Sequence, residues 1–242
     1  ILGSAADFII RSYLSHAGEL HTVGLYNAGF MVTMTYAGMV FHGMETDYFP
    51  RLSGVKHTGT TLNILVNRQI EVSILLISPL LVAMTVALPL LIPLLFSQEF
   101  GPVIGMMRGS ILAMYLRALS LPIEYIALSR GNSRAYLVQE GFAAVLLVVS
   151  VVTGFHFGGL TATGYSITIA TLLELIFVLF LTYYKYGYRL SRRAFRLMLL
   201  QTGLGLATLL AVLGLNGPAY WLVGASLVGV SETLSWRLCR PT

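Results

Sequence analysis

Ionisable side chains inside long apolar segments are the residues of this sequence best placed to do chemistry. The clearest set lies in segment 104–129, where Ser110, Arg117, Ser120 and Glu124 follow one another at spacings of seven, three and four residues. In a helix these spacings put the side chains on one stripe. Because burying a charge in lipid costs about 3 kcal/mol or more, the stripe is expected to face a bundle interior or a wet cavity. Arg117 would hold an anionic group of a substrate while Glu124 pairs with it or titrates, or the two would form a fixed ion pair.

A second polar stripe lies in segment 23–48 and consists of Thr35, Gly38, His42 and Glu45. Histidine titrates near neutral pH, so His42 and Glu45 have the chemistry to relay protons and are candidates for ion coupling. The alternative is a satisfied polar pair at the edge of the membrane.

Three other ionisable residues extend this set. Glu174 lies in the middle of segment 158–184, with Thr171 on its stripe, and is either a cation or proton site or a hydrogen-bonded structural carboxylate. Arg108 falls on the opposite side of its segment from Arg117, near the outer end, where a long side chain can reach the interface. Glu140 lies closer to a segment end. We expect Arg117 and Arg108 to bind substrate, and Glu124, Glu174, His42 and Glu45 to be candidates for ion coupling.

The elements that must position these residues are long apolar runs, each close to the ~20 residues that a helix needs to cross a bilayer. Lipid requires every backbone polar group to be satisfied within the protein, and no alternating barrel pattern is present. The sequence therefore predicts an all-α, polytopic transmembrane helix bundle with these spans: 23–48, 72–96, 104–129, 135–155, 158–184, 194–213 and 219–238.

The basic residues occupy alternate gaps between these runs. Twelve of the 15 Lys and Arg residues are Arg51, Lys56, Arg68, Arg130, Arg134, Lys185, Arg189, Arg192, Arg193, Arg196, Arg237 and Arg240, whereas the gaps around Gln98, His156 and Gly217 hold none. Because cytoplasmic loops collect Lys and Arg, the basic gaps and the C-terminus are predicted to face the cytoplasm.

Composition agrees with a membrane protein and excludes several other classes. The chain is 56% hydrophobic and only 10% charged, and its net charge of +5 is distributed as topological determinants, which argues against a nucleic-acid partner. These charges also favour anionic lipid at the cytoplasmic surface. The sequence carries no metalloprotease, nucleophile-elbow, phosphate-loop or aspartate-rich motif. We therefore predict no catalytic residue, cofactor or metal site.

The predicted organisation has four parts. Residues 1–15, which are apolar but too short to span and begin without methionine, are expected to be the end of a truncated transmembrane helix. Residues 16–184 would form a lobe with five full spans, 185–193 a cytoplasmic loop and 194–242 an appended pair of spans. The polar stretch 51–71 is expected to be a cytoplasmic loop, with or without an interfacial helix, and is too small for a folded soluble domain.

Three stretches resemble the oligosaccharide flippases, the O-antigen translocase branch of the multidrug, oligosaccharidyl-lipid and polysaccharide exporter superfamily. They are VGLYNAGFMV at 23–32 leading into DYFPRLS at 47–53, LPLLIPLLFSQEFGP at 88–102 and LPIEYIALSRGNSRAYLVQE at 121–140. The resemblance covers about residues 7–193, and the last two spans match only in general character.

The resemblance implies that the chain is the C-terminal lobe of a two-lobe transporter of the multidrug-exporter type, with an N-terminal lobe preceding it. Such proteins move a polyprenyl-pyrophosphate-linked oligosaccharide across the bacterial inner membrane by alternating access, driven by an ion gradient. Three alternatives remain open: a drug or metabolite exporter of the same fold, an integral membrane glycosyl or polyprenyl transferase, and a structural membrane subunit.

Overall fold

The computed structural model describes residues 2–18, 20–55 and 59–239, and within them every regular element is helical. The elements in chain order are α1 (Leu2–Ala17), α2 (Leu20–Phe30), a π-helical segment (Met31–Tyr36), α3 (Ala37–Gly54), α4 (Thr60–Leu95), a 3₁₀ turn (Gln98–Phe100), α5 (Val103–Ser129), α6 (Ser133–Tyr186), α7 (Arg192–Gly214) and α8 (Gly217–Cys239). The all-α prediction is confirmed.

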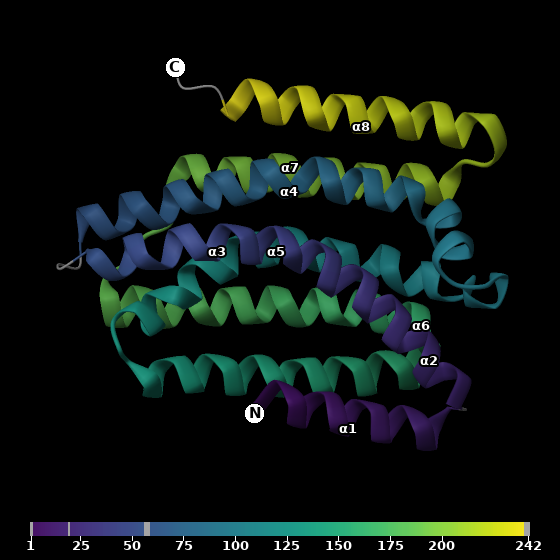
Figure 1. The fold of residues 1–242 in the computed structure, drawn as a ribbon, viewed down its shortest axis with the longest axis horizontal. Helices are drawn as coiled ribbons and strands as arrows, with labels where there is room; N and C mark the ends of the chain where they lie inside the picture. Colours follow the sequence, from purple (N-terminus) through teal and green to yellow (C-terminus); the bar gives the residue numbers. More distant parts are fainter. Residues whose placement is uncertain (1, 19, 56–58, 240–242) are drawn as a thin grey trace.

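The long helices form a bundle and run roughly along one common axis, whereas α2 crosses them obliquely on its way to α3 (Figure 1). Helix α5 lies inside it, with α6 packed on one side and α4 on the other, while α7 and α8 pack against α4. The fold thus has α6 on the α5 side and the α7–α8 pair on the α4 side. The predicted site residues of α5 lie between α5 and α6.

Four helices, α4, α5, α6 and α7, are long and apolar enough to cross a membrane. Their outer faces expose large apolar side chains, including Leu76, Leu80, Ile176, Phe180 and Leu210, as expected of helices that meet lipid tails. Helix α8 is long enough but less apolar, and the predicted span 23–48 is divided among α2, the π-helical segment and α3.

Helix α6 is two antiparallel rods joined by a sharp reversal (Figure 1). Gly158 and Gly159 have non-helical backbone angles, and Gly159 has φ 62° and ψ −151°, a conformation essentially restricted to glycine. The reversal falls where the sequence places the gap between two spans. The two rods, 133–157 and 160–186, therefore correspond to the predicted spans 135–155 and 158–184.

All of the predicted basic gaps that the structure describes lie at one end of the bundle, at the left of Figure 1. This basic end carries the α5–α6 turn, the α6–α7 loop, the approach from α3 to α4 and the end of α8. The α4–α5 connection, the α6 reversal and the α7–α8 turn lie at the other end. Lys56 and Arg240 lie outside the described residues. The alternation predicted from charge is thus a feature of the fold.

Most of the stretch 51–71, predicted as a cytoplasmic loop with or without an interfacial helix, is helical and continues the two flanking long helices. Helix α3 continues to Gly54 and α4 begins at Thr60. Leu62, Val66 and Ile70 are fully buried at a spacing of four, so one apolar face extends α4 beyond its hydrophobic run. Polar residues between them hid this face from a search for long apolar runs.

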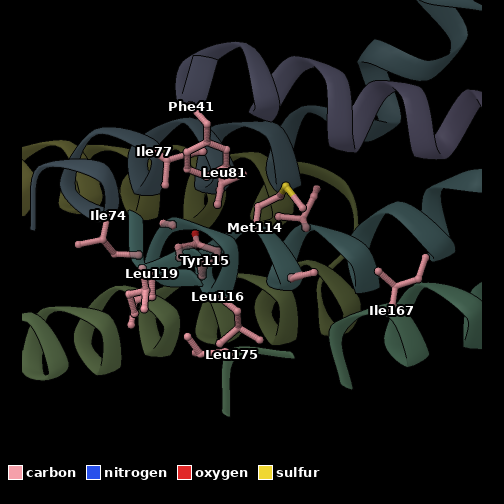
Figure 2. Close-up of a cluster of buried hydrophobic side chains, with 14 of the residues drawn as sticks. Phe41, Ile74, Ile77, Leu81, Met114, Tyr115, Leu116, Leu119, Ile167 and Leu175 are labelled. Carbon is pink, nitrogen blue, oxygen red and sulfur yellow. The ribbon is translucent and has the colours of Figure 1, made fainter. Parts of the chain in front are cut away.

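The core joins α3, α4, α5 and the second rod of α6 (Figure 2). Phe41, Ile77, Leu81, Tyr115 and Leu175 are among its buried side chains. Tyr115 lies opposite Gly205 of α7, where an added Cβ would come within 2.7 Å of the ring. Packing of this kind fixes the depth of α5 relative to its neighbours.

The backbones of α5 and the second rod of α6 approach each other very closely. A Cβ on Gly109 would lie 2.7 Å from the backbone of Gly164, and one on Gly164 would overlap the carbonyl of Met106. Thr168 adds a hydrogen bond of 2.7 Å to the carbonyl oxygen of Gly109. Small residues allow two backbones to approach in this way in membrane bundles, and they set the distance across which Arg117 meets α6.

Candidate functional site

The main candidate site is a cavity of about 350 Å³ between the 30–45 segment, α5 and both rods of α6, with the start of α1 along one side. Five ionisable residues from four helical segments line this Arg117 cavity: His42, Glu45, Arg117, Glu140 and Glu174. Four of them are residues that sequence analysis singled out for binding or coupling, although they are far apart in the chain. The fold therefore brings most of the predicted site together.

The central interaction of the cavity is an ion pair between α5 and α6. The Arg117 guanidinium donates a hydrogen bond of 3.0 Å from Nη1 to Oε1 of Glu174. The Glu174 side chain is 9% exposed and that of Arg117 is 32% exposed, so the carboxylate is packed into the wall while the guanidinium reaches the hollow. The partner of Arg117 in this pair is Glu174, whereas the sequence suggested Glu124 for a fixed pair.

Two further carboxylates surround the pair. Glu124 is buried on α5 within electrostatic reach of both Arg117 and Glu174, and its Oε1 has no hydrogen-bond partner in the described part of the chain. Glu140, from the first rod of α6, lines the cavity and acts electrostatically on the same two residues. Tyr136, one turn earlier, lies beside Glu140. Arg117 thus faces three glutamates.

His42 and Glu45 close the cavity toward α3. His42 Nδ1 and Glu45 Oε2 are 2.9 Å apart, and the side chains are 78% and 24% exposed respectively. Tyr125 of α5 lies beside Glu45. The pair is therefore an accessible hydrogen-bonded unit at the side of the cavity, which agrees with the geometry of either a relay or a satisfied polar pair.

The π-helical segment determines which residues of 30–45 reach the cavity. Phe30, Met34 and Gly38, spaced by four, all line it. In an α-helix a spacing of four drifts by about 40° per step because each residue turns by about 100°, whereas the wider π turn keeps such residues more nearly in line. Thr35, which the sequence placed on the polar stripe, is exposed and is not among the lining residues. The predicted stripe of four is therefore not one surface.

Arg108 does not belong to this site. It lies on α5 more than two turns before Arg117, it is partly exposed, and it does not line the cavity. Its Nε is buried without a hydrogen-bond partner in the described part of the chain. The structure therefore separates the two arginines that the sequence grouped as substrate ligands.

The charges of the cavity are unbalanced toward the acidic side. Its wall carries one guanidinium, Arg117, against the carboxyl groups of Glu45, Glu140 and Glu174, with Glu124 close behind. A site with more carboxylates than cations attracts a proton or a metal cation more strongly than an anion. Among the described residues no group of three or more His, Cys, Asp or Glu has the arrangement of a metal centre.

Glu140 is the residue whose importance sequence reasoning underestimated. Its distance from the middle of its own segment made it a weaker candidate, but the α6 reversal places it opposite Glu174 of the same helix. The relative position of the two rods is set by the close approach of Gly154 in the first rod to Thr163 and Ser166 in the second, which has no signature in the spacing of the charges.

In comparisons with protein-family models, curated proteins and solved structures, the chain matches none of them. The structure consequently establishes an all-helical bundle with four helices capable of spanning a membrane, and the site must be interpreted from its own geometry.

Proposed function

We propose that this chain is a lobe of an ion-coupled membrane transporter and that the Arg117 cavity is its coupling site. The observation that carries the proposal is the Arg117–Glu174 ion pair in a cavity wall with two further carboxyl groups. Buried charges in membrane helices are costly, so they mark ion or proton pathways more often than they serve structure alone.

In the proposed mechanism Glu174 exchanges partners. While Glu174 is ionised it accepts the hydrogen bond of Arg117 and ties α5 to the second rod of α6. When Glu174 binds a proton or a cation, its negative charge is neutralised. The guanidinium of Arg117 can then interact with Glu140 or Glu124. The contact between α5 and α6 then changes in strength, which is the kind of differential interaction that can bias two conformations of a transporter.

For the cargo we propose a polyprenyl-pyrophosphate-linked oligosaccharide, moved between the leaflets of the bacterial inner membrane with the basic end of the bundle in the cytoplasm. The resemblance of three sequence stretches to oligosaccharide flippases supports this choice, and the alternating basic gaps support the orientation. A second lobe would supply the other wall of the substrate path, as in transporters built from repeats.

The acidic balance of the cavity changes the role that we assign to Arg117. A pyrophosphate would meet Glu45, Glu140 and Glu174 beside the only guanidinium of this wall, an unfavourable environment for an anion. We therefore assign Arg117 to coupling, as the counter-charge of Glu174, in place of the substrate-binding role expected from the sequence.

The test is export in cells that carry the complete gene with single substitutions in this chain. Arg117→Ala and Glu174→Gln should each abolish surface polysaccharide while the protein remains in the membrane, and lipid-linked repeat units should accumulate on the cytoplasmic side. Glu99→Gln, which neutralises an exposed carboxylate outside the cavity, should leave export unchanged. Normal surface polysaccharide in both cavity variants would exclude the cavity from the mechanism.

A strain that lacks the gene separates the alternative functions. If the protein is a drug or metabolite exporter, surface polysaccharide in this strain will be intact and resistance to small cationic compounds will change. A glycosyl or polyprenyl transferase would lose incorporation of labelled sugar into lipid in isolated membranes, a step that a flippase does not perform.

A further inference from the structure

A second polar hollow lies away from the Arg117 cavity, at the basic end of the bundle. One hollow of about 830 Å³ is bounded by the start of α4, the α6–α7 loop and the end of α8, and a neighbouring one of about 600 Å³ continues between α4 and α8. Both are lined by Leu75 and Cys239. We treat them as one surface, the α4–α8 groove.

The outer part of the α4–α8 groove is basic. Arg68, Arg189 and Arg193 line it, with Glu71 as the one carboxylate. Arg193 Nε is 3.3 Å from Glu71 Oε2, so this pair is largely neutral and two guanidiniums remain in excess. Both excess residues, Arg68 and Arg189, are exposed. This part of the groove therefore presents two positive charges to anything that enters it.

The wall beneath these arginines is held rigidly by Asn67. Its Nδ2 donates hydrogen bonds to the carbonyl oxygens of Asn63 (2.7 Å) and Arg189 (2.9 Å), and its Oδ1 accepts from the backbone N–H of Ser191 (2.7 Å) and the hydroxyl of Tyr188 (3.2 Å). The backbones that carry Arg68 and Arg189 are thus fixed relative to each other, and the Arg189 guanidinium lies over the ring of Tyr183, 5.8 Å from its centroid. Less backbone has to be ordered when a ligand binds between them.

The surface of the inner part of the groove is mostly apolar, and its two charged lining residues, Glu232 and Arg237, are of opposite sign and exposed. Leu75, Leu76 and Pro79 of α4 face Trp236 of α8, and Leu76 and Trp236 are 54% and 67% exposed. The basic part and the apolar part follow one another along α4, from the basic end of the bundle toward its middle. A ligand that fills both must have an anionic head and a hydrocarbon tail.

We propose that the α4–α8 groove binds an anionic phospholipid of the leaflet at the basic end, with its phosphate between Arg68 and Arg189 and an acyl chain against Leu76, Pro79 and Trp236. Charge complementarity selects an anionic head over a zwitterionic one, because arginine clusters next to membrane helices attract acidic lipid. The apolar wall distinguishes this ligand from a free phosphate. The proposal requires that α4 and α8 lie in a bilayer.

This lipid site is independent of ion coupling. The Arg117 cavity is lined by α1, the 30–45 segment, α5 and α6, whereas the groove is lined by α4, the α6–α7 loop, the start of α7 and α8. The two share no lining residue. A bound phospholipid would hold α8 against α4 near the ends of both helices. Loss of the lipid site would therefore leave the Arg117–Glu174 pair intact, and failure of one proposal would not imply failure of the other.

The experiment uses the fluorescence of Trp236. The chain contains two tryptophans, and Trp221→Phe leaves Trp236 as the reporter within the groove. The protein is placed in phosphatidylcholine bilayers that contain increasing fractions of phosphatidylglycerol brominated on its acyl chains, or of brominated phosphatidylcholine. We expect the anionic brominated lipid to quench Trp236 at lower mole fractions than the zwitterionic one.

Charge substitutions then locate the head group. Arg68→Gln and Arg189→Gln should each lower the relative affinity for the anionic lipid roughly fivefold, the effect of removing one basic residue near a membrane surface. Arg134→Gln, an exposed arginine at the same end of the bundle but outside the groove, should leave the preference unchanged.

Three results would overturn the proposal. Equal quenching by the two brominated lipids would show that the groove does not select charge. Loss of the preference on addition of inorganic phosphate would identify a site for a free anion. Displacement of brominated phosphatidylglycerol by undecaprenyl phosphate, without displacement by unlabelled phosphatidylglycerol, would identify a site for the polyprenyl carrier.

Discussion

Arg117 and Glu174, 57 residues apart in the sequence, form a hydrogen-bonded ion pair of 3.0 Å that joins α5 to the second rod of α6. The pair lies in the wall of a cavity that also contains Glu140, and Glu124 is close to both partners. One guanidinium therefore serves several carboxylates, and removing either partner changes the charge state of the whole cluster.

Glu174→Gln should destabilise the protein by leaving the Arg117 guanidinium without its partner. Breaking a fully buried pair costs about 3–5 kcal/mol. Because Arg117 is 32% exposed to the cavity, we expect about 2 kcal/mol, measured as a lower thermal unfolding temperature in detergent. The double variant Arg117→Gln/Glu174→Gln should recover most of the loss. A double variant that is less stable than Glu174→Gln would contradict the pairing.

Gln201 of α7 should be essential for holding α7 and α8 on α4. It is fully buried, its Oε1 accepts a hydrogen bond of 2.6 Å from Ser78 of α4, and its Nε2 donates one of 3.1 Å to Ser235 of α8. Gln201→Leu keeps the size but removes both bonds, at about 1–2 kcal/mol each at most in a membrane bundle.

We expect faster proteolysis of the α7–α8 connection in Gln201→Leu than in the unmodified protein. The matched control is Ser226→Ala, because Ser226 is exposed on α8 and donates its hydrogen bond within its own helix, to the carbonyl oxygen of Leu222. Equal protease sensitivity of the two variants would show that apolar packing alone holds the pair of helices.

Gly164→Ala should separate α5 from the second rod of α6. The new Cβ would overlap the carbonyl of Met106, and relieving such an overlap costs about 1–3 kcal/mol. The measurement is the thermal unfolding temperature. Gly141→Ala, in the first rod of the same helix with no atom within 4 Å of the added Cβ, should be neutral or slightly stabilising. Similar losses in both variants would contradict the close contact.

Tyr188 in the α6–α7 loop should make stability fall at high pH. Burial raises the pKa of Tyr188 well above its usual value of about 10. The folded protein keeps the Tyr188 phenol neutral, whereas the unfolded chain ionises it above pH ~10. The free energy of unfolding is therefore unaffected by this group below pH ~10 and falls above it by about 1.4 kcal/mol per pH unit. Tyr188→Phe should therefore lose less stability than the unmodified protein above pH ~10, measured by denaturant unfolding across pH. Parallel curves would contradict the prediction.

The helical class, the positions of the reversals and the alternating basic ends could all be predicted, because runs of apolar residues and the placement of arginine are local signals. The start of α4 could not be found in the same way. There Asn63, Asn67 and Glu71 interrupt the apolar run, and the reason for their polarity is the α6–α7 loop, more than a hundred residues away in the sequence.

The candidate site was predictable residue by residue but not in its pairing. Arg117 and Glu174 are conspicuous because they are charges in apolar segments. That they meet, and that Glu124 lies beside the pair without bonding Arg117, depends on the rotation of α5 against α6. This rotation is set by the contact of Gly109 with Gly164, and no periodicity within either helix encodes it.

The π-helical segment Met31–Tyr36 has one consequence for how this chain can vary. A π turn contains about one residue more than an α turn, and each residue of an α-helix turns by about 100°. Deleting a single residue between positions 31 and 36 would restore a continuous α-helix and swing the whole of α3 by roughly a quarter turn. His42 and Glu45 would then point away from Arg117, although neither had been substituted, so the length of this segment carries as much information about the site as the identity of its side chains.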